Sequence, residues 1–177
     1  MGICCFKGYR PFCLPFGEDE VNPKGIELKA VIRRTVEKVI DKGFTYFICG
    51  FDLGADMIFA EILVGLKSEH PEVRLESAIP YENHAAKWPE NQRERYFNLL
   101  AKCDIETMLQ THYTADCNIR CSKYMVGKSD ILITVYNGKL SRAMVTVNYA
   151  TQLGKKVICI DPETLTVTEN GTGIALN

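Results

Sequence analysis

Short apolar runs alternate along this chain with longer segments in which apolar residues recur every three or four positions. Each run is short enough for one buried strand and ends at glycine, proline or a polar stretch. The runs cover residues 3–6, 44–49, 73–79, 131–136 and 157–160. This pattern predicts five strands, each followed by a turn or a helix.

The amphipathic segments between the runs predict helices. The clearest begins at Pro23, because Asn22 is a good N-cap and proline fits the first helical position. Its apolar face is formed by Leu28, Ile32, Val36 and Val39. Gly43 stands where a C-terminal cap belongs. Further helices are expected over residues 54–66, 89–101, 118–128 and 141–153, whereas the pattern of residues 104–113 is ambiguous.

Strands that alternate with helices require crossover connections, which produce a mostly parallel sheet with helices on both faces. We therefore expect an α/β fold: a Rossmann-like three-layer αβα sandwich with five or six strands. The chain of 177 residues suits one domain, expected over residues 1–168. The Gly- and Thr-rich residues 169–177 are expected to form a loosely ordered tail.

Composition and charge narrow the functional classes. The formal net charge is −1, so no global basic field would attract nucleic acid or an acidic membrane. No apolar run approaches the ~20 residues needed to span a bilayer. Cys49 and Cys159, two of the eight cysteines, lie inside apolar runs, and the chain opens with a strand-like segment instead of a basic leader. These features favour a reducing, cytoplasmic environment.

Ligands in an open parallel sheet bind beyond the carboxyl ends of the strands, which makes the strand-to-helix junctions the candidate sites. The first junction contains Gly8, Tyr9 and Arg10. A glycine there permits close approach of a ligand, and arginine can hold a phosphate with two hydrogen bonds. The alternative is a tight turn with a solvated arginine.

The second junction contains Gly50, Asp52, Gly54, Ala55 and Asp56. Glycines between a strand and a helix start present backbone N–H groups, which is typical of an anion site. The spacing is not that of a dinucleotide fingerprint, so it gives no evidence for NAD. The two aspartates either hold a ribose hydroxyl or themselves accept from those N–H groups.

The third junction contains Asn137, Gly138 and Arg142. The Asn-Gly pair predicts a turn with positive φ. A cation near a helix start indicates a neighbouring anion, unless the side chain is simply solvated. In the polar segment after the third strand, Tyr81 is placed to stack on a base, with His84 and Trp88 nearby, although an anchoring aromatic is the commoner case.

A metal site is not expected. Cys117 and Cys121 lie one helical turn apart, with His112 upstream. Structural zinc normally requires four ligands, and no second pair has suitable spacing. We therefore expect neither a metal nor another cofactor.

Taken together and in this order, the junctions resemble those of the SLOG superfamily, and within it the YpsA/YoqJ-like bacterial and prophage proteins. The resemblance covers about residues 1–162. Its motifs are a TGxRP-like turn at residues 7–11, an SGxxxGxDxxAAE-like junction at residues 49–61, a proline-aromatic loop with Trp88, and a KSD-strand junction at residues 128–130. The resemblance implies a Rossmann-like fold and a nucleotide-type ligand.

The chain departs from that family at the third junction. Relatives carry a Gly-Gly-Thr phosphate loop where this chain has Ser141, Arg142 and Ala143, so Arg142 is expected to replace N–H donors with a charge. In the phosphoribohydrolase branch, the catalytic glutamate would fall at Thr146. The resemblance therefore implies the loss of that acid/base group, and no catalytic residue is assigned.

We prefer non-catalytic binding or sensing of a nucleotide or ADP-ribose-like ligand. One alternative is a nucleotide hydrolase or N-glycosidase, in which Glu61, Asp52, Asp56 or Asp130 would act as acid or base. The other is a nucleic-acid or protein interaction module on the same scaffold. The near-neutral charge argues against nucleic acid, whereas exposed helix faces in such folds often support homodimers.

Overall fold

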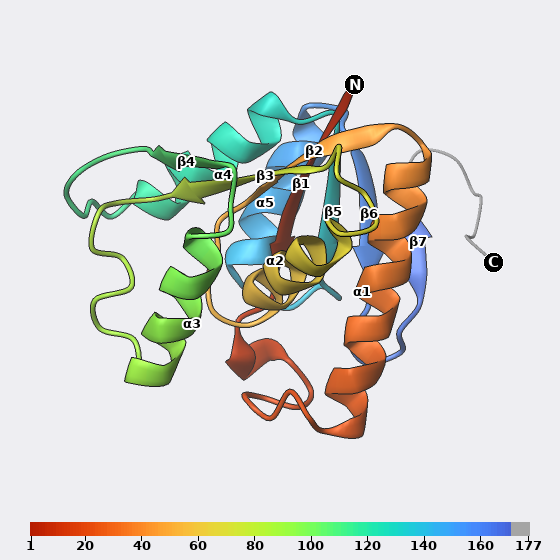
Figure 1. Cartoon of the computed structure of the whole chain (residues 1–177), viewed down its shortest axis with the longest axis horizontal. Helices are drawn as coiled ribbons and strands as arrows, with labels where there is room; N and C mark the ends of the chain where they lie inside the picture. The colour runs from red at the N-terminus through yellow and green to blue at the C-terminus, as the bar shows by residue number, and fades with distance from the viewer. Residues whose placement is uncertain (171–177) are drawn as a thin grey trace.

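A computed structural model describes residues 1–170 and shows one mixed sheet covered by helices on both faces (Figure 1). Within those residues the sheet has seven strands in the order β4-β3-β2-β1-β5-β6-β7. All neighbouring pairs are parallel except β6 and β7. The strands are β1 (Gly2–Gly8), β2 (Phe44–Cys49), β3 (Arg74–Ile79), β4 (Ile105–Met108), β5 (Ile131–Val135), β6 (Lys156–Ile160) and β7 (Val167–Glu169). The predicted Rossmann-like α/β class is confirmed, but the sheet has seven strands and not the expected five or six.

Five α-helices connect the strands. They are α1 (Pro23–Asp41), α2 (Ala55–Leu66), α3 (Glu90–Leu100), α4 (Cys117–Lys128) and α5 (Arg142–Gln152), and a short 3₁₀ turn covers Pro11–Cys13. Helix α1 begins as predicted, because the Asn22 side chain accepts a hydrogen bond from the backbone N–H of Lys24 at 3.1 Å. The strand order reverses between β1 and β5, which places the ligand-binding crevice of this fold class at their carboxyl ends.

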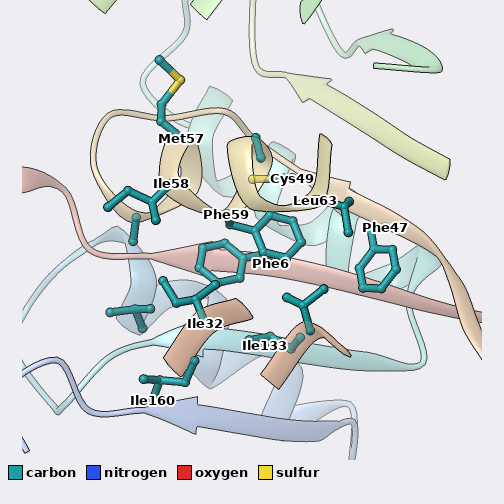
Figure 2. Packing of buried hydrophobic residues seen from close by; sticks show 14 of the residues in the cluster. Phe6, Ile32, Phe47, Cys49, Met57, Ile58, Phe59, Leu63, Ile133 and Ile160 are labelled. Carbon is teal, nitrogen blue, oxygen red and sulfur yellow. The ribbon is translucent and has the colours of Figure 1, made fainter. Parts of the chain in front are cut away.

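The two faces of the sheet bury different side chains. Phe6 of β1 stacks on Phe59 of α2 with ring centroids 4.2 Å apart, and Figure 2 shows both rings in the cluster beneath α2. Its neighbour Cys5 points to the opposite face, where it joins the smaller cluster under α4 and α5. This alternation is the period of a strand that is buried on both faces.

The sheet has two strands beyond the five clear apolar runs. Strand β4 lies within the ambiguous residues 104–113 and forms one edge of the sheet, with Ile105 and Met108 exposed. Strand β7 pairs antiparallel with β6, and the Asn170 backbone N–H donates to the Val157 carbonyl at 3.1 Å. Both strands are too short to carry a local periodicity. Of the expected tail, Glu169 and Asn170 therefore continue this pairing, and residues 171–177 lie outside the described residues.

Two further features bear on the expected environment. None of the helices within residues 1–170 has both the length and the apolar character that crossing a membrane requires. All eight cysteines lie within the described residues and are unpaired.

The stacked pair at the centre of the larger core gives a first prediction. Phe59→Ala removes a fully buried ring and leaves a cavity, so the free energy of unfolding should fall by about 3–5 kcal/mol in urea titrations. Phe97→Ala is the matched control, because Phe97 is 59% exposed and its loss should cost about 0.5 kcal/mol or less. Equal losses in the two variants would contradict the packing described here.

Candidate functional site

A cavity of about 700 Å³ lies beside the carboxyl ends of β1, β2 and β3. Helix α4 and the segment between β3 and α3 form much of its wall. Its lining residues are Lys7, Arg10, Gly50, Asp52, Pro80, Tyr81, Asn83, His84, Ala86, Lys87, Trp88, Tyr113, Asn118, Cys121, Ser122, Met125 and Arg142. The volume falls within the range of ordinary small-molecule sites.

A buried ion cluster forms the floor of this cavity. The Lys7 ammonium, at the end of β1, lies 3.1 Å from Asp56 Oδ2 and 3.4 Å from Asp52 Oδ2. The other oxygen of Asp56 accepts from the Gly8 backbone N–H at 2.8 Å. All three ionic side chains are buried, so each depends on the others for compensation of its charge.

The pKa values in the cluster follow from burial and from the neighbouring charges. Burial alone would raise the pKa of Asp52, but the positive charges of Lys7, Arg10 and Arg142 outweigh it and hold that pKa at about 2. Burial opposes the charge on Lys7, yet Asp56 and Asp52 raise its pKa above the ordinary value. For Asp56 burial dominates and raises the pKa, because Lys7 offsets it only in part.

Two arginines approach Asp52 from separate elements. Arg142, the first residue of α5, donates from Nη1 to Asp52 Oδ2 at 3.0 Å, and its side chain is 44% exposed. Arg10 places Nε 3.5 Å from Asp52 Oδ1. Arg10 Nε is buried and has no hydrogen-bond partner within residues 1–170, and the Arg10 side chain lines the cavity. Arg10 of the first strand-to-helix junction and Arg142 of the third therefore meet at Asp52 of the second.

Aromatic side chains form another wall of the cavity. Tyr81 packs edge-on against Tyr113 at 5.5 Å between ring centroids and against His84 at 6.0 Å. His84 in turn packs edge-on against Trp88 at 5.1 Å and Tyr96 at 5.0 Å. Both imidazole nitrogens of His84 are buried and lack a hydrogen-bond partner in the described part of the chain. Burial lowers the pKa of His84 to about 4, so the ring is neutral at pH 7.

Three backbone N–H groups of the second junction are already bonded within the protein. Those of Asp52 and Leu53 donate to the Asp56 and Asp52 carboxylates, and that of Ala55 donates to the Tyr9 carbonyl at 2.9 Å. This geometry agrees with the alternative in which the aspartates accept from these groups. Gly54 has φ +89°, and a Cβ there would lie 2.5 Å from the Tyr9 carbonyl oxygen.

Tyr9 joins the first junction to the third. Its side chain is fully buried, and its hydroxyl donates to Asn137 Oδ1 at 2.9 Å while accepting from the backbone N–H of Lys139 at 2.9 Å. Gly138, between them, has the positive φ that the Asn-Gly turn predicts, at 98°. Tyr9, Asn137 and Gly138 are absent from the cavity lining, and their contacts position the loop that leads to Arg142.

Comparison with known proteins places this architecture in a family. The YpsA family model, described as the YspA SLOG family, matches residues 4–164. The chain belongs to the YspA SLOG family. Similar proteins include a UPF0398 protein of Staphylococcus haemolyticus, 26% identical over 73% of this chain and 70% of the relative. A UPF0398 protein of Halalkalibacterium halodurans is 27% identical over 77% and 73% of the two chains. The predicted SLOG membership is confirmed.

Solved structures of the same fold have lower sequence identity. TM1055 is 13% identical with a TM-score of 0.56, over 89% of this chain and 72% of its own. The DNA processing protein A (DprA) of Helicobacter pylori is 15% identical with a TM-score of 0.57, over 90% of this chain and 65% of its own. DprA of Streptococcus pneumoniae is 11% identical with a TM-score of 0.57, over 91% of this chain and half of its own.

The structure shows what occupies the position of the glutamate implied by the phosphoribohydrolase branch. Thr146 is fully buried, and its hydroxyl lies 2.9 Å from that of Ser122, between α5 and α4. This SLOG chain therefore offers no carboxylate at that place. Among residues 1–170 no group of three or more His, Cys, Asp or Glu side chains could hold a metal ion.

Several lining residues carry no strong signal in the sequence. Lys7 belongs to the turn at residues 7–11 but is not among the predicted site residues, although a lysine at the end of a buried strand is a signal for a buried ion pair. Asn118, Cys121, Ser122 and Met125 reach the cavity from successive turns of α4. No local pattern marks them, because their role depends on how α4 packs over the sheet.

The buried histidine gives a pH-dependent prediction. The unfolded chain binds a proton at His84 near its ordinary pKa of 6.5, whereas the folded protein does so only near 4. The free energy of unfolding should therefore be unaffected by His84 above pH 6.5. It should fall progressively between pH 6.5 and pH 4, by up to about 3 kcal/mol, because only the unfolded chain takes up the proton there. His84→Phe keeps an aromatic ring and removes the titration, so urea unfolding should show a weaker loss over this interval. An identical pH dependence in the variant would contradict the assignment.

Proposed function

We propose that the cavity binds a nucleotide-type small molecule, either a nucleotide or an ADP-ribose-like compound, without turning it over. The observation that carries this proposal is that Arg10 and Arg142 line the same cavity as Tyr81 and Trp88. Guanidinium groups suit phosphate, and aromatic faces suit a base. The position beside the strand-order reversal supports the same class of ligand.

The polar end of the cavity supports phosphate recognition by side chains. The backbone N–H groups of Asp52, Leu53 and Ala55 are bonded within the protein, so these three are not free to hold a phosphate. Arg10 and Arg142 instead project charged donors from the first and third junctions. A planar guanidinium forms two parallel hydrogen bonds to a phosphate, which fixes both its position and its orientation.

The absence of turnover is the second part of the proposal. Where the resemblance to the phosphoribohydrolase branch implies a catalytic glutamate, this chain has Thr146, whose hydroxyl is hydrogen-bonded to that of Ser122. The cations around Asp52 hold its pKa at about 2, so at pH 7 it has no proton to donate to a leaving group. Asp56 is fully buried, does not line the cavity and is bonded to Lys7 and to the Gly8 N–H. His84 is neutral at pH 7, but both its nitrogens are covered.

Single-stranded nucleic acid is a second candidate ligand. DprA of Helicobacter pylori, which shares this fold, binds single-stranded DNA. Stacking aromatics with nearby cations would also suit a strand, and Lys87 adds an exposed cation to the lining. The net charge of −1 makes this candidate weaker than a small molecule.

A thermal-shift screen tests the proposal. Purified protein is melted with nucleotides, ADP-ribose, cyclic dinucleotides, NAD and oligothymidylate, and each compound that shifts the melting temperature is checked for breakdown by mass spectrometry. A ligand at about 100 times its Kd should add about 2.7 kcal/mol. Arg142→Gln should weaken binding at least about tenfold, because it removes charged hydrogen bonds to phosphate.

Arg120→Gln is the matched control, since Arg120 is an exposed arginine of α4 that pairs with Asp116 and does not line the cavity. It should keep wild-type binding. No shift with any compound would overturn the binding function. Breakdown of a bound nucleotide would overturn the absence of turnover, and a salt-sensitive shift with oligothymidylate alone would favour the second candidate.

A further inference from the structure

The Asp52 carboxylate lies among three cations that line the cavity. It is contacted by Arg142 at 3.0 Å, by Lys7 at 3.4 Å and by Arg10 at 3.5 Å. Two of these three cations are the residues through which we propose that the ligand phosphate is bound. A phosphate that engages them must therefore lie close to a fixed negative charge.

The charges of the cluster leave little excess for a ligand. Lys7, Arg10 and Arg142 are positive, Asp52 and Asp56 are negative, and together they carry one net positive charge. Lys87 is exposed at the rim, where solvent screens its charge. Interactions inside the cluster are screened less, because Lys7, Asp52 and Asp56 are buried.

We propose that Asp52 sets the charge of the phosphate group that this cavity accepts, favouring a singly charged phosphodiester or cyclic phosphate over a doubly charged terminal phosphate. The inference rests on the proposed nucleotide-binding function and names its ligand class more closely. A phosphate with one negative charge would neutralise the net positive charge of the cluster. A second negative charge would face the Asp52 carboxylate without a cation to compensate it.

Asp52 is better placed for this role than Asp56. Asp52 lines the cavity and contacts both arginines, whereas Asp56 is fully buried and bonds Lys7 and the Gly8 N–H. Asp56 therefore stabilises the floor of the cavity, and Asp52 faces the ligand. The carboxylate of Asp52 stays ionised throughout the neutral pH range, so its repulsion is constant.

Matched nucleotides that differ in phosphate charge test the inference. Affinities for 3′,5′-cyclic AMP and 5′-AMP, and for the two guanosine equivalents, are measured by calorimetry near pH 7.5, where the terminal phosphate is mostly a dianion because its second pKa is about 6. The wild-type protein should prefer the cyclic nucleotide. Asp52→Asn should improve binding of 5′-AMP relative to cyclic AMP by about tenfold, which corresponds to about 1.4 kcal/mol.

Two further variants separate this role from a general change of charge. Asp52→Glu restores the carboxylate and should restore the preference for the cyclic nucleotide. Glu163→Gln removes one negative charge outside the cavity, where Glu163 pairs with Lys24 and Lys139, and should leave the preference unchanged. Circular dichroism and melting temperature show whether each variant is folded.

A measurement on the wild-type protein covers the case in which Asp52→Asn does not fold. Near pH 5 the phosphate of 5′-AMP carries mostly one charge, so its disadvantage against cyclic AMP should shrink. An unchanged preference in Asp52→Asn, or a pH-independent preference in the wild type, would overturn the inference while leaving nucleotide binding intact. If none of the four nucleotides binds and the broader screen is also silent, the proposed function fails and the inference fails with it.

Discussion

The ion cluster of Lys7, Asp52 and Asp56 is the interaction on which the candidate site depends. A lysine that ends a buried strand must be compensated, and both carboxylates come from the junction between β2 and α2. Removing one partner of such a cluster leaves an uncompensated charge, which typically costs about 3–5 kcal/mol. The cluster therefore fixes the β2–α2 junction against the end of β1, and the Gly8 N–H bond to Asp56 strengthens this connection.

The third junction is attached to the same centre by two contacts. The buried Tyr9 hydroxyl holds the loop after β5 through Asn137 and Lys139, and Arg142 then reaches Asp52 from the start of α5. Three segments that are distant in sequence thus converge beside one cavity. At this edge of the sheet the chain presents the arginine side chains of Arg10 and Arg142 to the cavity.

The sequence predicts the features whose cause is local and leaves out those whose cause is tertiary. Helix α1 and the buried strands carry strong periodicity and caps, so their positions agree with the structure. Strands β4 and β7 depend on pairing with distant segments and leave no local pattern. Asp52, Arg10 and Arg142 could be placed at one edge of the sheet, because the carboxyl ends of parallel strands meet there. That the Tyr9 hydroxyl bonds residues 128 and 130 positions away could not be read from the chain.

Trp88 offers the most direct test of the central claim, because it is the only tryptophan of the chain and it lines the cavity. Its fluorescence is titrated with ADP-ribose and with 3′,5′-cyclic AMP, using free tryptophan amide to correct for absorption by the nucleotide. The account predicts a saturable change in Trp88 emission with at least one of these ligands, shifted to higher concentration in Arg142→Gln. An emission that follows the free tryptophan reference at every concentration would contradict the claim that this cavity binds nucleotides.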